Sequence, residues 1–289
     1  GHQKDTGTLF ASWISDEATL ANEIKRDTPE MCVIGNPPYS GESSNKGKWI
    51  MDLMEDYKKE PGGKEKLKER NPKWINDDYV KFIRFGQYLV EKNGEGIVAF
   101  INPHGFLDNP TFRGMRWKLL KTFDKIYTID LHGNSKKKET SPDGSADQNV
   151  FDIMQGVSIN LFVKTNKKAK NELGKVFHYD LFGKRNDKYN FLNQNSIKTI
   201  DYKELPNKAP MYFMVNKDFD VEEIYEKFFS LKELFAFKNI GVATANDKIL
   251  IGDDFSDLKL KVEKFYNLEF ELKNVENIFY RPFDLRKIY

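Results

Sequence analysis

The chain has 289 residues, enough for one large or two medium domains, and its 39% hydrophobic and 31% charged residues are typical of a globular protein with a real core. A net charge of +2 excludes a strong overall attraction for nucleic acid, so any binding of nucleic acid must depend on local basic patches. A single cysteine, Cys32, excludes an internal disulfide, and the lack of a signal-peptide pattern or of any apolar run near the roughly 18 residues of a membrane span predicts a cytoplasmic protein without a membrane segment.

The first predicted elements lead to a short strand. Residues 16–26 predict a helix with Ser15 as its N-cap, because apolar residues recur on one helical face. The apolar run 31–34 predicts a buried strand, in which Cys32 is a small buried hydrophobic residue. The segment 40–76, rich in Gly, Lys, Glu and Asn, predicts a largely exposed connection that is mobile until a partner docks on it.

An alternation of helices and strands continues after this connection. Residues 78–92 predict an amphipathic helix, and the apolar run 97–102 predicts a central strand covered on both faces. A second amphipathic helix over 111–123 and a strand over 126–131 follow. The order helix–strand–helix–strand–helix–strand over 16–131 predicts an α/β fold with a parallel, doubly wound sheet.

The pattern changes in the second half of the chain. A long polar segment, 132–156, precedes a strand over 157–163 whose apolar and polar residues alternate, as in an edge-like antiparallel strand. A basic stretch after Lys164 predicts a domain boundary near 168–175, which gives domains 1–168 and 169–289. In the second domain, apolar residues at helical spacing predict a helix over 218–236.

The sequence Asn36-Pro37-Pro38-Tyr39 forms a stiff corner directly after the first predicted strand. Two consecutive prolines fix φ twice, and Asn36 is held away from the helical region because a proline follows it. The Asn36 side-chain oxygen and the Pro37 carbonyl are then two hydrogen-bond acceptors on a rigid frame, and Tyr39 offers a face for stacking. This set suits a planar amino group, such as that of adenine, whose two hydrogens must be accepted before its nitrogen can attack.

The corner also carries a resemblance to a known family. The stretch VIGNPPYS (33–40) resembles motif IV of the S-adenosylmethionine-dependent DNA methyltransferases that modify adenine N6. The stretches around residues 77–108 and 112–138, and DQNVFDIMQGVSINLFVK, resemble the helices and strands that follow this motif. With GVATANDKILI and YRPFDLRKIY further on, the chain is similar to type ISP and type IIG restriction–modification enzymes, in which a target-recognition domain follows the methyltransferase domain.

The resemblance implies roles for single residues. Asn36 and the Pro37 carbonyl would accept hydrogen bonds from the target amino group, Pro38 would shape the turn, and Tyr39 would stack on a flipped adenine. Phe151 would be the second aromatic residue of the base pocket. The lysines that would reach DNA phosphates are Lys136, Lys137 and Lys138.

Candidate DNA contacts also lie at the end of the second predicted domain, in the sequence YRPFDLRK. Arg281, Arg286 and Lys287 are basic residues interleaved with aromatic ones, a composition that suits phosphate and groove contacts. The same stretch also fits a purely structural closing segment, and the sequence leaves both interpretations open.

The chain departs from the family pattern ahead of the corner. The family places a glycine-rich cofactor loop there, whereas Gly7 is the only glycine near such a position. The resemblance therefore implies a partial Rossmann-like methyltransferase sheet, its C-terminal half, followed by a mixed α+β domain. We expect the S-adenosylmethionine site and an N-terminal part of the same polypeptide to lie upstream, the first strand to present an exposed apolar edge, and the isolated chain to be inactive.

Two other functions remain open from the sequence. The same tetrad serves protein methyltransferases that modify a glutamine amide, because an amide nitrogen needs the same two acceptors. The chain also fits a non-catalytic DNA-recognition module. The histidines at 104, 132 and 178 show no metal-ligand spacing, so we expect no metal site.

Overall fold

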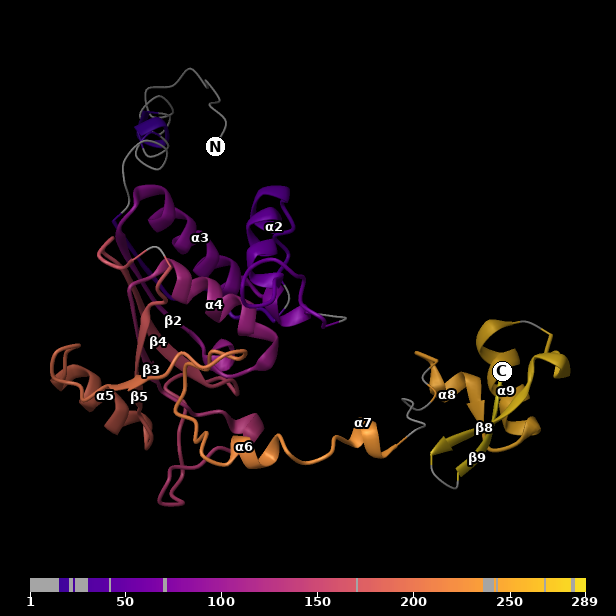
Figure 1. Ribbon diagram of the computed structural model, residues 1–289. Coiled ribbons are helices and arrows are strands. Elements are labelled where there is room, and N and C mark those ends of the chain that lie inside the picture. The colour runs from indigo at the N-terminus through magenta and orange to yellow at the C-terminus, as the bar shows by residue number, and fades with distance from the viewer. Residues whose placement is uncertain are drawn as a thin grey trace. The chain divides into compact units, whose positions relative to one another are not determined.

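The computed structural model describes residues 16–20, 23, 31–41, 43–69, 72–169, 171–235, 242, 244–267, 269–281 and 284–289. The chain divides into two compact units, Gly1–Lys217 and Asp218–Tyr289, and each is described by itself (Figure 1). Residues 16–20 and 23 are helical, in agreement with the predicted helix, whereas its proposed cap Ser15 lies outside the described residues.

The first unit is built around a six-stranded sheet in the order β1-β2-β4-β3-β5-β6. Its strands are β1 (Cys32–Gly35), β2 (Gly96–Pro103), β3 (Lys125–Asp130), β4 (Val157–Lys164), β5 (Lys175–Asp180) and β6 (Lys203–Leu205). Strands β1, β2, β3 and β5 run in one direction, and β4 and β6 run in the other. The predicted α/β class is confirmed, but the sheet is mixed rather than wholly parallel because β4 inserts between β2 and β3.

Helices cover both faces of this sheet (Figure 1). The helices are α2 (Lys48–Met54), α3 (Asp78–Asn93), α4 (Arg113–Thr122) and α5 (Arg185–Gln194). The predicted apolar stripes of α3 and α4 enter one core, where Ile83, Met115 and Leu119 are fully or almost fully buried. On the other face, α5 packs Phe191 against Tyr179 of β5 with ring centroids 5.3 Å apart.

Gly86 explains how closely α3 approaches the sheet. A Cβ atom at this position would lie 3.0 Å from Val98 of β2, tighter than most real contacts. Only a residue without a side chain lets α3 lie this close to β2 at position 86 without a shift of its neighbours. The helix ends at Gly94, whose φ of 89° is a conformation that glycine adopts without strain.

Two strand predictions need correction. Strand β4 is antiparallel as predicted, but it is not an edge strand, since it pairs with β2 on one side and β3 on the other. Strand β1 is not buried: it pairs with β2 alone among the described strands, Cys32 is exposed, and Ile34 is 81% exposed. A short apolar run at a sheet edge resembles a buried central strand in sequence, and only the missing neighbour distinguishes the two.

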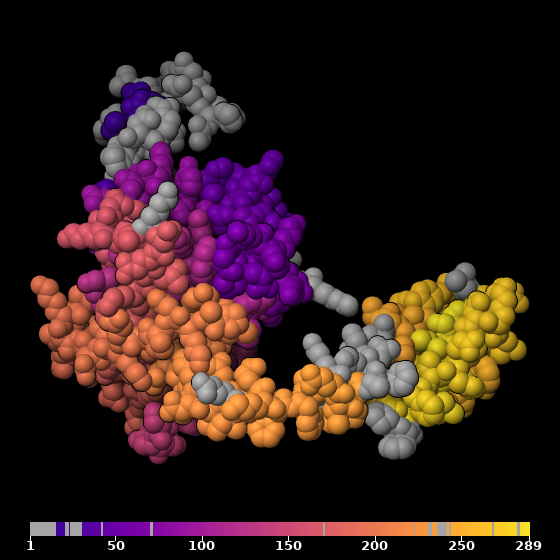
Figure 2. Space-filling view, viewed as in Figure 1, coloured from indigo at the N-terminus to yellow at the C-terminus, as the bar shows by residue number. Residues whose placement is uncertain are grey.

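The described residues of the segment 40–76 form a packed structure rather than an open connection. It contains α2, the short 3₁₀ helices η1 (Glu55–Lys58) and η2 (Lys73–Asn76), and a bridge between Lys59 and Lys66. Arg113 at the start of α4 binds both Glu60 and Glu69 and so fastens the segment to the core. In the space-filling view its indigo and violet atoms lie directly against the magenta helices (Figure 2).

The domain boundary also lies later than predicted. Strand β5 pairs with β3, and β6 pairs with β5, so the residues after 168 complete the first sheet instead of opening a new domain. The first unit extends to Lys217, and the predicted division into 1–168 and 169–289 falls inside it. The basic stretch that suggested the boundary is a surface connection between β4 and β5.

The second unit is a small α+β assembly, as predicted in class. Its elements are α6 (Glu222–Tyr225), α7 (Leu231–Leu234), α8 (Asp247–Leu250), β7 (Ile251–Gly252), α9 (Phe255–Tyr266), η6 (Leu272–Asn274), β8 (Glu276–Arg281) and β9 (Asp284–Ile288). An antiparallel sheet in the order β7-β9-β8 packs with α9 around Ile251, Leu258 and Val262. The single helix predicted over 218–236 is wrong: α6 and α7 are two short helices there. Within the described residues, no helix has the length and apolar character needed to cross a membrane.

Candidate active site

The candidate site lies where four strands of the first unit end. Strands β1, β2, β3 and β5 run in the same direction, so their last residues, Gly35, Pro103, Asp130 and Asp180, lie along one edge of the sheet. The proline corner, the 3₁₀ helix η3 (His104–Leu107) and the loops after β3 and β5 therefore meet at this edge. Open α/β sheets bind their ligands at the carboxyl ends of their strands.

The corner presents its acceptor to the surface. Asn36 and Pro38 are exposed, Pro37 is buried, and Tyr39 is half-buried. The Tyr39 hydroxyl lies 2.7 Å from Asn36 Oδ1 and 3.1 Å from the Ile101 carbonyl oxygen. Burial raises the pKa of Tyr39 to about 12, so the phenol stays protonated and acts as a donor. Because a carboxamide oxygen has two lone pairs, Asn36 Oδ1 retains capacity for a second donor.

The residues after the corner are fixed to the start of α3. The Gly41 N–H donates to the Asp77 carboxylate at 3.1 Å, and Ser40 Oγ donates to Asp78 Oδ2 at 2.8 Å. Asp77 is 4% exposed, and burial raises the pKa of its carboxyl group. Asp77 is the N-cap residue of α3, but its carboxylate binds the corner and makes no capping hydrogen bond to the helix. The corner is thus held between β1 and α3.

A cavity of about 510 Å³ opens beside Tyr39. We call it the Tyr39 cavity; its volume lies within the roughly 300–1,000 Å³ typical of small-ligand sites. Its walls combine aromatic rings with basic and amide side chains. The lining residues are Tyr39, Ser40, Gly41, Trp74, Asp77, Tyr79, Gly105, Asn109, Phe112, Asn134, Lys136, Lys137 and Gln155.

The basic loop predicted to bind phosphates borders this cavity. Lys136 and Lys137 line it from the 3₁₀ helix η5 (Ser135–Lys137), and both are exposed. Lys138 does not belong to the lining; it lies at the C-cap of η5 with a φ of 51°. The structure therefore brings two of the three predicted lysines to the corner and leaves the third outside.

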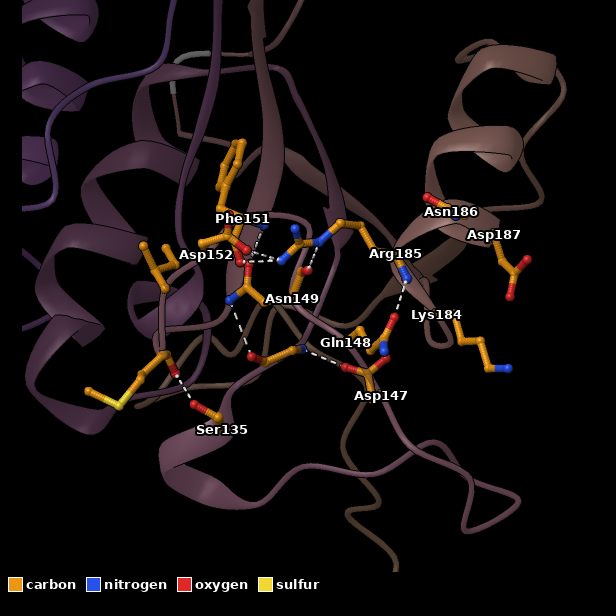
Figure 3. A pocket seen from close by; sticks show the side chains of 13 residues that line it. Ser135, Asp147, Gln148, Asn149, Phe151, Asp152, Lys184, Arg185, Asn186 and Asp187 are labelled. Carbon is orange, nitrogen blue, oxygen red and sulfur yellow. Dashed lines mark hydrogen bonds and ion pairs between the residues drawn. The ribbon is translucent and has the colours of Figure 1, made fainter.

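Phe151 lies on a different cavity, which has a volume of about 1030 Å³ (Figure 3). Arg185 shapes this wall: its guanidinium donates to the carbonyls of Asn149 at 2.8 Å and Phe151 at 3.0 Å and pairs with Asp152 at 2.7 Å. Tyr39 and Phe151 border the same apolar cluster, around Val157, but Phe151 does not line the Tyr39 cavity. In this conformation the two aromatic rings predicted to sandwich a base do not share one pocket.

The candidate contacts in the second unit differ in how free their charges are. Arg281 is exposed at the end of β8, with its guanidinium 5.5 Å from the Tyr280 ring centre. Arg286 pairs with Asp253 and Asp284, and Lys287 binds Asn277 and lies over the Phe255 ring. These contacts give Arg286 and Lys287 structural roles within the small sheet and leave Arg281 the more available cation of the three.

The sequence analysis missed a buried network that joins three histidines. His104 Nδ1 lies 2.9 Å from Asp130 Oδ1, and its Nε2 lies 3.2 Å from the Asn134 amide nitrogen. His178 contacts Thr128 at 2.7 Å and Asp180 at 3.1 Å. Although the three histidines show no metal-ligand spacing in the sequence, the fold brings them into one hydrogen-bonded network. A usable signal was present, because His104, Asp130 and Asp180 each stand at the carboxyl end of a strand in the same parallel set.

His132 is the charged centre of this network. Its Nδ1 lies 3.1 Å from Glu139 and its Nε2 lies 2.9 Å from Asp180, so both nitrogens face carboxylates and must both carry protons. Burial opposes this charge, but the bonds to Asp180 and Glu139 outweigh it and raise the pKa of His132 to about 9. Although burial opposes their charges too, the imidazolium lowers the pKa of Glu139 to about 2 and also lowers that of Asp180.

The same residues form the cluster best placed to hold a metal. One ligand atom each of His104, Asp130 and His132 lies within 4.8 Å of the others. Each ring nitrogen of the two histidines already has a hydrogen-bond partner, however, and His132 is charged. A metal needs a free imidazole nitrogen, so the hydrogen bonds within the cluster account for its arrangement without an ion.

The network makes stability depend on pH in a defined direction. A histidine whose pKa rises from about 6.5 in the unfolded chain to about 9 in the folded protein stabilises the fold fully below pH 6.5, and this stabilisation is lost as the pH rises through 9. The lowered pKa of Glu139 stabilises the fold above pH 4.5, and this stabilisation is lost as the pH falls toward 2. We expect the free energy of unfolding, measured by urea titration, to fall by about 2–3 kcal/mol between pH 6 and pH 9.5. A His132→Gln variant should show no such fall beyond that of other titrating groups, and an equal fall in the variant would contradict the assignment.

The glycine-rich cofactor loop of the resembled family has no counterpart among the described residues next to the corner. The corner is preceded by β1, and no glycine-rich turn from a strand into a helix lies beside it among the described residues. Of the sequence ahead of β1, only residues 16–20, 23 and 31 are described. The corner itself offers carboxamide and carbonyl oxygens as acceptors and an aromatic ring for stacking, a set that suits a planar amino group.

Comparisons with known proteins agree with the sequence resemblance. Residues 31–137, which contain the corner, α3, α4 and the basic loop, match the Eco57I restriction-modification methylase family. No significant match was found among curated proteins.

Solved structures show the same fold. A DrdV–DNA complex matches with a TM-score of 0.67 and 21% identity, covering 98% of this chain and 33% of that one. The type ISP restriction-modification enzyme LlaBIII bound to DNA matches with a TM-score of 0.69 and 18% identity, covering 99% of this chain and 22% of that one. A nuclease-deletion mutant of the type ISP enzyme LlaGI with a DNA substrate mimic matches with a TM-score of 0.69 and 19% identity, covering 99% of this chain and 32% of that one. The chain thus resembles a part of these enzymes and spans a third or less of their length.

Proposed function

We propose that this chain is part of a site-specific DNA adenine-N6 methyltransferase of a restriction–modification system and that it holds the flipped adenine and contacts double-stranded DNA. The observation that carries the proposal is the corner: an exposed Asn36 and a half-buried Tyr39 at a strand end, opening on a cavity that Lys136 and Lys137 also line. The matched methylase family and the DNA complexes among the similar structures support it.

The chemistry follows from the acceptors at the corner. Asn36 Oδ1 and the Pro37 carbonyl accept hydrogen bonds from the two N–H groups of the adenine amino group. These bonds draw the amino nitrogen toward tetrahedral geometry and free its lone pair. Tyr39 provides an aromatic face beside the base. This catalysis uses positioning and fixed dipoles and needs no strong base. A base in this pocket has left the duplex, so the target adenine must be flipped out of the DNA.

The remaining parts of the enzyme belong to the proposal as well. The methylase family uses S-adenosylmethionine, and we place the binding elements for it in an N-terminal part of the same polypeptide. The open edge of β1, where Ile34 is 81% exposed, is the surface on which such a part would extend the sheet. We assign the second unit to target recognition, with Arg281 as its most available candidate contact.

Product analysis tests the reaction. The complete protein, incubated with S-adenosylmethionine and unmodified duplex DNA, should produce N6-methyladenine, detected by mass spectrometry after digestion to nucleosides. The isolated chain of 289 residues should produce none. Formation of N4-methylcytosine would contradict adenine specificity, and methylated glutamine in an added protein would favour the protein-substrate alternative. DNA binding without any methylation by the complete protein would favour a recognition module.

DNA binding tests the basic loop separately. Replacing Lys136 and Lys137 together with glutamine should weaken binding of duplex DNA and flatten the plot of log affinity against log salt by about 0.9 for each phosphate that is no longer neutralised. Filter binding of the complete protein at several salt concentrations measures both effects. Lys138→Gln removes one positive charge from outside the cavity lining and serves as the control, compared with the double variant per charge removed. Equal losses of affinity per charge in the control and the double variant would mean that the cavity has no special part in phosphate binding.

A further inference from the structure

The turn that carries the lysines of the Tyr39 cavity, residues 133–139, closes on Glu139. The Asn134 N–H donates to Glu139 Oε2 at 2.8 Å, and the Glu139 N–H donates to the Asn134 carbonyl at 3.3 Å. Asn134 Oδ1 in turn accepts from the Lys137 N–H at 3.2 Å. The lysine side chains themselves extend into solvent. The position of the lysines is therefore set by Asn134 and Glu139, not by interactions of their own side chains.

His132 connects this closed turn to the sheet. Its Nδ1–H donates to Glu139 Oε1, and on the opposite side of the ring its Nε2–H donates to Asp180 at the end of β5. The ring also stacks on Phe182, with centroids 3.8 Å apart and planes 13° from parallel. Only a ring that is protonated on both nitrogens can donate to two carboxylates on opposite sides.

We propose that His132 is a positioning residue, which as an imidazolium between Glu139 and Asp180 sets the turn 133–139 so that Lys136 and Lys137 face the Tyr39 cavity. The proposal rests on the proposed function for what the lysines bind. The placement of the turn itself does not depend on that function. It adds to the corner a charged residue that does not touch the substrate but aligns the groups that do.

The other charged groups around His132 are consistent with this role. The Asp130 carboxylate lies 3.9 Å from Nδ1, and His104 meets the ring edge-on at 6.3 Å. His178 Nε2 contacts the same Asp180 oxygen at 3.1 Å. Three carboxylates, those of Glu139, Asp180 and Asp130, thus surround the imidazolium.

The start of the turn has an anchor that does not involve His132 (Figure 3). The Gly133 N–H donates to Asp147 at 2.6 Å, and Asn149 donates to the Gly133 carbonyl at 3.2 Å. A Cβ at Gly133 would lie 2.4 Å from the Asn149 backbone, which shows how tightly the two loops pack. The Asn134 side chain also keeps its contact with His104 at 3.2 Å, so loss of the His132 charge should release the rest of the turn, residues 135–139, while Gly133 stays in place.

Amide hydrogen exchange tests the positioning directly. In His132→Gln, protection of the amides of 135–139 should fall about tenfold or more, because the hydrogen bonds that hold the turn through a charged ring are removed. Glu139→Gln should have the same effect from the turn side while His132 is retained. His178→Gln is the matched control: it removes a buried histidine from the same Asp180 but from no group of the turn.

In the wild type this protection should also decline as the pH rises through about 9, after correction for intrinsic rates. Unchanged protection in both His132→Gln and Glu139→Gln would overturn the proposal, as would an equal fall in protection in His178→Gln.

DNA binding by the complete protein then links the turn to function. His132→Gln should weaken duplex binding no more than the Lys136→Gln/Lys137→Gln double variant does, and adding it to the double variant should have no further effect. A fully additive fall in affinity in the triple variant would overturn the proposal, because His132 would then act elsewhere. If the double variant binds DNA as the wild type does, the phosphate-binding part of the proposed function fails, while the exchange experiment still decides the role of His132.

Discussion

Asn36→Ala in the complete protein should reduce the rate of methyl transfer to adenine on the order of 10²–10³-fold, the size of effect found when one preorganised hydrogen-bond partner is removed from a reacting group. The reason is that Asn36 Oδ1 is the side-chain acceptor of the corner. Among the described residues, the Tyr39 hydroxyl is the side-chain group bonded to it, and this hydroxyl is a donor that cannot replace the lost acceptor. Affinity for duplex DNA should stay within about twofold, because Asn36 contributes no charge to phosphate binding. Single-turnover rates and filter binding measure the two quantities separately.

Variants at Tyr39 sharpen this prediction. Tyr39→Phe keeps the ring and removes only the hydroxyl that contacts Asn36 Oδ1, so it should retain most activity. Tyr39→Ala removes the stacking face and should weaken base binding by about 1–3 kcal/mol. Asn36 is exposed, and its replacement should change the unfolding free energy by no more than about 0.5 kcal/mol. Full activity in Asn36→Ala, or a loss of activity explained by unfolding, would remove the corner from the mechanism.

The elements that were predicted correctly depend on local patterns. Helices α3 and α4 carry apolar stripes over three turns or so, and β2 and β3 are apolar runs between clear turns. Gly86 and Gly94 carry local signals of the same kind, because a helix that approaches a sheet closely and a helix that ends in a residue with positive φ both favour glycine. Such signals are contained within a few residues of each other.

The errors in the first unit all concern partners that are distant in the sequence. Strand β4 alternates apolar and polar residues, but Ser158 and Asn160 are fully buried, where Asn160 donates to Asn102 of β2 at 3.0 Å. Buried polar residues that form hydrogen bonds across strands look like solvent-facing residues in a single sequence. In the same way, β5 was separated from the sheet because nothing local indicates its parallel pairing with β3.

The candidate site likewise has one part that local sequence predicts and one part that depends on distant residues. The corner could be predicted because its four residues are contiguous and two prolines limit their conformations. The histidine network could not be predicted from spacing, since His104, His132 and His178 come from separate loops and strands that only the sheet order brings together. Gly156 illustrates the point: a Cβ there would lie 2.4 Å from the His104 ring, yet nothing in the sequence around Gly156 indicates a histidine.

The most destabilising single change we predict is Lys188→Met in α5. Lys188 is fully buried, and its Nζ pairs with Asp147 at 2.8 Å and donates to the carbonyls of Leu131 and Gln148. The Asp147 side chain is also fully buried and accepts from the amides of Gly133 and Gly183. Removal of the lysine leaves a buried carboxylate and two carbonyl groups without their partner, which should lower the unfolding free energy by about 3–5 kcal/mol.

Tryptophan fluorescence isolates this effect in the first unit. All tryptophans of the chain precede residue 218, so urea titration followed by their emission reports on the first unit alone. Lys184→Met is the matched control, because Lys184 is exposed at the start of the same helix and its replacement should change stability by no more than about 0.5 kcal/mol. Since Asp147 also holds Gly133, the Lys188→Met variant should weaken the turn that carries Lys136 and Lys137 even below its unfolding midpoint. Equal midpoints for the two variants would show that the Asp147–Lys188 pair does not fasten these loops to the sheet.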